Sequence, residues 1–136
     1  MNVGVIVIVA VVVLGVAFGV WRHFRDGRVR QVRDVERVTV EQLGSQLGEK
    51  ATLLQFSSAF CQPCRATHRI LEEVTSMVPG VVHIDIDAES HLELVRELDV
   101  LRTPTVFILD ADGVITQRAS GLPRKADVIA AIGNIV

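Results

Sequence analysis

The only two cysteines of this 136-residue chain lie two residues apart, within the segment Phe60-Cys61-Gln62-Pro63-Cys64. An apolar run precedes them and a helical pattern follows, so Cys61 is expected at the N-terminus of a helix. Unpaired N–H groups and partial positive charge at such a position favour the thiolate form of a cysteine. A thiolate with a second thiol in reach exchanges electrons with other disulfides through a mixed disulfide. The pattern therefore predicts that Cys61 attacks and that Cys64 resolves the mixed disulfide.

Metal binding is the alternative for the same cysteines, because a C-x-x-C pair also begins many zinc sites. His68 follows Cys64 by four residues, a spacing that places both side chains on one face of a helix. The sequence offers no second C-x-x-C pair and no clear fourth ligand. We therefore interpret the pair as redox-active and expect neither a metal nor an organic cofactor.

The first elements around the pair are two strands and the helix between them. Residues 51–57 form an apolar run typical of a buried strand. Apolar residues recur at helical spacing over residues 66–78, and Pro79-Gly80 is expected to end this helix. Residues 81–86 predict a second strand. The cysteines thus lie where a strand gives way to a helix.

The remaining pattern predicts a short helix, a hairpin and a last helix. Ser90-His-Leu-Glu93 has the spacing of a capping box and predicts a helix to about residue 98. Residues 103–109 and roughly 114–119 predict two strands, joined by a turn at Ala111-Asp112-Gly113. A helix follows Pro123. Alternating helices and strands of this kind indicate a small α/β domain with a mixed sheet.

Three segments carry a resemblance to the thioredoxin family. They are the cysteine segment after the first strand, Thr103-Pro104-Thr105 and the turn at residues 111–113. Over about residues 38–136 the chain resembles this family, which implies a thioredoxin-like fold with a central mixed sheet flanked by helices. The resemblance also implies that Pro104 follows a cis peptide bond and faces the cysteines, with the Thr103 backbone free to pair with an extended substrate. The partner groove that it implies comprises Phe60, Gln62, Pro63, Thr103, Pro104 and Gly121.

Four positions depart from the pattern of that family. Phe60 stands where tryptophan is common, and Arg69 where a helix-kinking proline is expected. Gln55 falls at the position of a buried acid that assists proton transfer, and His83 at that of the lysine often paired with it. Since Gln55 cannot titrate, we expect the buried proton relay of the family to be absent or altered here.

The N-terminal segment has the length and composition of a membrane span. The 19 residues from Val3 to Trp21 carry no charge and are nearly all apolar, enough for a helix to cross a bilayer core. A signal peptide is the alternative, but a positive n-region and a small-residue cleavage site are not evident. We expect residues 1–21 to be a retained anchor and residues 22–37 an arginine-rich linker. Gly15 and Gly19 form a G-x-x-x-G pattern that could support a weak homodimer.

The distribution of charge predicts the orientation of that anchor and excludes one class of partner. Six arginines follow the span: Arg22, Arg25, Arg28, Arg30, Arg33 and Arg37. The positive-inside rule therefore predicts a cytoplasmic domain, with an extracytoplasmic domain as the alternative. From Val38 onward, eight basic and 13 acidic residues give a net charge near −5. An acidic domain argues against nucleic-acid binding.

These observations combine into one functional hypothesis. We expect a single-pass, membrane-anchored protein-disulfide oxidoreductase whose residues 38–136 form a thioredoxin-like domain. Its partners would be protein disulfides or dithiols and a second redox protein that regenerates it. The alternative is a non-catalytic membrane adaptor or redox sensor that binds a partner through the groove at Pro104.

Overall fold

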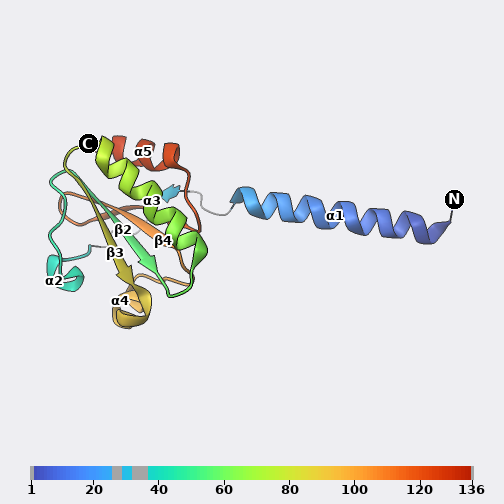
Figure 1. Cartoon of the computed structure of the whole chain (residues 1–136), viewed down its shortest axis with the longest axis horizontal. Coiled ribbons are helices and arrows are strands. Elements are labelled where there is room, and N and C mark those ends of the chain that lie inside the picture. The colour runs from blue at the N-terminus through green and yellow to red at the C-terminus, as the bar shows by residue number, and fades with distance from the viewer. Residues whose placement is uncertain (1, 26–28, 32–36, 136) are drawn as a thin grey trace.

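The computed structural model describes residues 2–25, 29–31 and 37–135 (Figure 1). Its elements, in chain order, are α1 (Val3–Arg25), β1 (Val29–Gln31), α2 (Val40–Leu43), β2 (Ala51–Ser57), α3 (Gln62–Met77), β3 (Val81–Asp87), the 3₁₀ helix η1 (Ala88–Ser90), α4 (Leu92–Glu97), β4 (Thr105–Asp110), β5 (Ile115–Ser120) and α5 (Lys125–Gly133). The expected mixed α/β fold and the long apolar N-terminal helix are both confirmed.

Five strands form one mixed sheet in the order β1-β5-β4-β2-β3. β2 and β3 run parallel, joined by α3, whereas β2–β4, β4–β5 and β1–β5 are antiparallel pairs. The short strand β1 comes from the segment expected to be a linker and pairs with the edge of the sheet. The C-terminal end of β2, where the cysteine loop begins, therefore lies next to both β3 and β4.

Helices cover both faces of this sheet, which explains why β2 is apolar throughout. α3 and α5 lie on one face (Figure 1). They pack on it through a cluster that includes Leu71, Val74 and Val128. α2 and α4 lie on the other face, where Leu94 packs into a second cluster with Phe56. The six residues 51–56 are all buried because each side chain of β2 meets one of these two layers.

Helix α3 owes its position to an apolar face of helical period. Its buried residues are Cys64, Thr67, Leu71 and Val74, spaced three or four apart. The helix ends at Met77, just before Pro79-Gly80, as the sequence predicts. Because this face packs on the sheet, the N-terminus of α3 is fixed beside the ends of β2 and β4.

The predicted capping box at Ser90 is wrong. Helix α4 begins after His91, which makes no side-chain cap. Asp87 instead caps the preceding η1: its Oδ1 accepts a hydrogen bond from the Glu89 N–H at 3.0 Å, and its Oδ2 accepts one from Ser90 Oγ at 3.0 Å. A carboxylate at the end of β3 thus takes the role that the pattern assigned to the serine. A capping box does occur elsewhere, between Thr39 and Gln42.

Helix α1 extends away from the domain (Figure 1). Its 23 residues include a window of mean hydropathy 3.1, and none of that window is buried within the structure. Such a helix meets the length and composition of a membrane span, and a signal sequence meets them as well.

Candidate active site

Cys61 and Cys64 form a disulfide at the N-terminus of α3. Cys61 is the N-cap residue, and its sulfur accepts a hydrogen bond from the Cys64 N–H at 3.2 Å. Pro63, in the first turn, has no N–H of its own and so leaves no unpaired donor there. The backbone thus directs a donor at the Cys61 sulfur, as thiolate stabilisation at this position requires.

The two sulfur-bearing residues differ in exposure. Cys64 is 4% exposed and packs beneath the helix end, whereas Cys61 is only partly buried. An external disulfide can therefore approach Cys61 but not Cys64. This asymmetry is what the roles of an attacking and a resolving thiol require.

Phe60 stands at the rim of the site with a fully exposed ring. Its side chain is 100% exposed, and its φ of 60° lies in the left-handed region that phenylalanine rarely adopts. Together with Cys61 and Cys64, it lines a depression that also includes Ser58. The ring is thus available to contact a partner that reaches the disulfide.

The residues around Pro104 line a second depression. The Thr103–Pro104 bond is cis, as expected, and both residues line this hollow together with Pro63 and Gly121. The Gly121 N–H donates to the Pro104 carbonyl at 2.8 Å, which fixes the two segments against each other.

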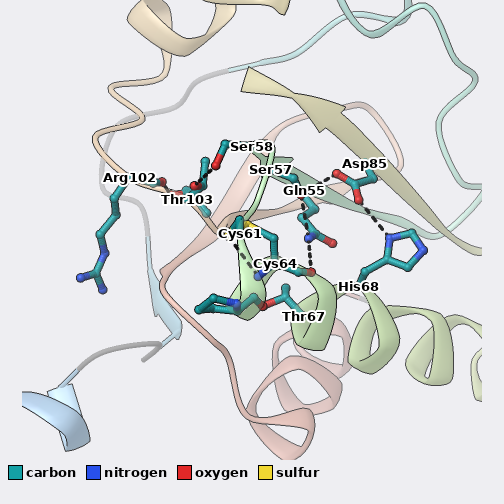
Figure 2. Close-up of a disulfide and its surroundings, with 12 residues drawn as sticks. Gln55, Ser57, Ser58, Cys61, Cys64, Thr67, His68, Asp85, Arg102 and Thr103 are labelled. Atoms are coloured by element: carbon teal, nitrogen blue, oxygen red, sulfur yellow. Dashed lines mark hydrogen bonds and ion pairs between the residues drawn. A yellow bond between two sulfur atoms is a disulfide. The ribbon is translucent and has the colours of Figure 1, made fainter. Parts of the chain in front are cut away.

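A hydrogen bond connects the two sides of the site. Ser58 Oγ, before the cysteines, and Thr103 Oγ1, before the cis bond, lie 2.8 Å apart (Figure 2). The predicted groove residues therefore surround two adjacent hollows. Gln62 is the exception, because it is exposed in the first turn of α3 and lines neither.

Gln55 lies directly behind the cysteines and is fully buried. Its Nε2 donates to the Cys64 carbonyl at 3.0 Å and to Ser57 Oγ at 2.9 Å, and its Oε1 accepts from His83 Nε2 at 2.9 Å. The amide of Gln55 thus makes three hydrogen bonds at the position where the resemblance implies a buried acid in the family. No group that could take up a proton stands at this position.

Two histidines and a carboxylate continue this network to the surface. Ser57 Oγ donates to Asp85 Oδ1 at 2.7 Å, and Asp85 Oδ2 lies 3.0 Å from His68 Nδ1 (Figure 2). The rings of His68 and His83 lie 4.8 Å apart. Burial, with a smaller effect of the neighbouring His68, lowers the pKa of His83 below its ordinary 6.5, while Asp85 and Glu72 oppose this shift.

This network could not be found from the sequence alone. The resemblance indicated only that Gln55 and His83 occupy the positions of a buried acid and of the lysine often paired with it. The parallel pairing of β2 and β3 sets Gln55 opposite Asp85 and Ser57 opposite Asp87. Ser57 and Asp85 are therefore diagonal neighbours on one face of the sheet, within hydrogen-bonding reach. No local sequence pattern sets the register of that pairing.

The sequence profile of the thioredoxin family matches residues 34–134. The chain belongs to the thioredoxin family. A thioredoxin from Chlamydia trachomatis is 28% identical over 100 residues, which cover 74% of this chain and 97% of that protein. The putative thioredoxin H10 of Arabidopsis thaliana is 25% identical over 113 residues, covering 80% of this chain and 73% of the relative.

Solved structures show the same fold for this thioredoxin-family chain. Chloroplastic thioredoxin z, whose crystal structure is known, has a sequence 25% identical to this chain. The two structures match with a TM-score of 0.58 over 78% of this chain and 97% of that one. For two further curated relatives, thioredoxin domain-containing protein 2 of Mus musculus and thioredoxin H5 of Oryza sativa, the match covers 15% and 53% of the relative's length. The family and the Cys61–Cys64 disulfide together support thiol–disulfide oxidoreductase chemistry.

Proposed function

We propose that this protein is a membrane-anchored thiol–disulfide oxidoreductase that exchanges electrons with protein disulfides through Cys61 and Cys64. The observation that carries the proposal is the contrast between the two residues. Cys61 is accessible at the N-terminus of α3 and faces a backbone donor, whereas Cys64 is buried directly behind it. Only one of the two sulfurs can meet a large partner.

In the reduced protein, the Cys61 thiolate attacks one sulfur of the substrate disulfide. A mixed disulfide forms and the first substrate thiolate leaves. The Cys64 thiolate then attacks the Cys61 sulfur, which closes the intramolecular disulfide and releases the second substrate thiolate. Two electrons pass to the substrate, and the two protons lost by the cysteines balance those gained by the substrate thiols. A dithiol of a second redox protein restores the reduced pair by the reverse exchange.

Gln55 has a positioning role in this mechanism. It holds the Cys64 carbonyl and cannot accept the thiol proton, so that proton passes to water or to the departing thiolate. Phe60 and the depression at Pro104 supply the contact surface for the substrate backbone and side chains. The chain then needs no metal and no organic cofactor for the exchange itself.

The anchoring part of the proposal rests on α1. Its residues 3–21 carry no charge, the helix is not covered by the domain, and Arg22 and Arg25 lie in its last turn, which favours a span with the domain on the cytoplasmic side. An impermeant maleimide applied to intact cells after reduction tests this orientation. Labelling of Cys61 before lysis would contradict a cytoplasmic domain. The weak homodimer through Gly15 and Gly19 stays a prediction.

The exchange is tested with the full-length protein in detergent micelles, by reduction of insulin disulfides with dithiothreitol as the electron donor. Cys61→Ser is expected to abolish turnover, because it removes the accessible nucleophile. Cys64→Ser is expected to accumulate a mixed disulfide with the substrate, visible on a non-reducing gel. If both variants bound partners normally and the wild type showed no turnover, the adaptor hypothesis would replace this one.

A further inference from the structure

Four side chains with metal-binding atoms face one another beside the active site. His68 and Glu72 lie one turn apart on α3, and His83 and Asp85 lie two residues apart on β3. Residues at i and i+4 of a helix share a face, as do residues at i and i+2 of a strand. All four line one shallow depression on the surface between the two elements.

The hydrogen bond to Gln55 leaves one ring nitrogen of His83 available to a metal ion. His83 Nε2 donates to the Oε1 of the buried Gln55 at 2.9 Å, which leaves Nδ1 with a lone pair. No hydrogen bond of Nδ1 is found among the described residues. Metal-binding histidines characteristically donate their second N–H to a carbonyl or carboxylate in this way, because it fixes both tautomer and ring position.

His68 lies between two carboxylates. Its Nδ1 lies 3.0 Å from Asp85 Oδ2, and its Nε2 lies 2.9 Å from Glu72 Oε1. A neutral imidazole has one N–H, so one of its nitrogens would place a lone pair against a carboxylate oxygen. A metal ion bound between the ring and one of the carboxylates would remove that repulsion.

We propose that His68, His83 and Asp85 bind a zinc ion, with water in the fourth position. One ligand atom from each of these three residues lies within 4.8 Å of the others. Ligands about 2.1 Å from a tetrahedral zinc ion are about 3.4 Å apart, so small side-chain rotations close the site. Imidazole nitrogen and carboxylate oxygen are both ligands that zinc takes.

This site differs from the zinc alternative weighed for the cysteines. The Cys61 and Cys64 sulfurs are joined to each other, and both ring nitrogens of His68 point to carboxylates. The zinc would also stand close to the redox pair, because His68 and Asp85 line the depression of the disulfide too. The proposal does not depend on the exchange activity, since its ligands include no sulfur.

The test is a calorimetric titration of zinc chloride into the oxidised full-length protein in detergent micelles. Oxidation removes the thiolates as competing ligands. The wild type is expected to bind one equivalent, and His68→Gln and His83→Gln are each expected to weaken binding at least tenfold. The matched control is His91→Gln, which removes a histidine outside the cluster and should leave the affinity unchanged.

Three results would overturn the proposal: no saturable binding by the wild type, unchanged affinity in both cluster variants, or an equal loss in the control. Because His83 also supports Gln55, its variant could fail to fold, and circular dichroism would reveal that. A second measurement needs no variant. In NMR spectra of the wild type, the ring protons of His68 and His83 should shift on addition of one equivalent of zinc, while those of His91 stay. Shifts at His91 alone would refute the assignment.

Discussion

Replacing Gln55 with glutamate changes the site by one atom and tests the account of the buried network. In the wild type, the amide nitrogen donates to the Cys64 carbonyl at 3.0 Å and to Ser57 Oγ. A carboxylate in the same place would set a negative oxygen against that carbonyl, with no solvent to compensate, since position 55 is fully buried. Burial and the lost donor both raise the pKa of the introduced carboxyl.

The sign of the pH dependence follows directly. A carboxyl whose pKa is raised on folding destabilises the folded state only when it is ionised in the unfolded chain, that is, above about pH 4.3. At pH 4 the Gln55→Glu protein should lose only about 1 kcal/mol, for one hydrogen bond not replaced. As the pH rises toward 8, the deficit should grow to roughly 4–5 kcal/mol, because a deeply buried carboxyl can resist ionisation by that much.

Urea unfolding of the two oxidised proteins measures this deficit. Both are followed by far-ultraviolet circular dichroism in detergent micelles with EDTA, between pH 4 and pH 8, and the wild type corrects for every other titrating group. The partners of position 55, which are Ser57, His83 and the Cys64 carbonyl, are the same in both proteins, so the difference isolates position 55. A deficit that stays constant from pH 4 to pH 8 would refute the buried placement of this side chain.

Two further substitutions test the packing that holds the site. Phe107→Ala should lower the free energy of unfolding by about 3–5 kcal/mol, because the buried ring packs edge-to-face on Phe56 with centroids 5.7 Å apart. Urea unfolding measures this loss, and a loss under about 1 kcal/mol would contradict the packing. Gly113→Ala should cost more than Gly44→Ala in the same assay. Both glycines have positive φ, but only at Gly113 would a Cβ overlap a backbone carbonyl oxygen, and equal losses would contradict the hairpin geometry.

The sequence predicts those parts of the protein that short-range patterns determine. The cysteine pair, strand β2 and the end of α3 are local signals, because spacing, apolar runs and a Pro-Gly pair need no distant partner. Strand β1 was not predicted, since three residues become a strand only by pairing with β5. The capping of η1 by Asp87 was missed because Ser90 fits a common local pattern that competes with it. The pairing of His68 with Asp85 depends on how α3 lies across β3, which no local pattern encodes.

The pairing of β1 with β5 has a mechanical consequence for the proposed anchored enzyme. Only three residues separate Arg25 at the end of α1 from Val29 at the start of β1, and a chain of that length reaches at most about 14 Å. The domain would therefore stay close to the bilayer surface and diffuse within a thin layer parallel to it. Collisions with disulfides on other membrane proteins become a search in two dimensions, at an effective concentration set by the area of the membrane. The concentration of substrates dissolved in bulk solution is not raised by this confinement. The enzyme would therefore favour membrane-bound disulfides over soluble ones.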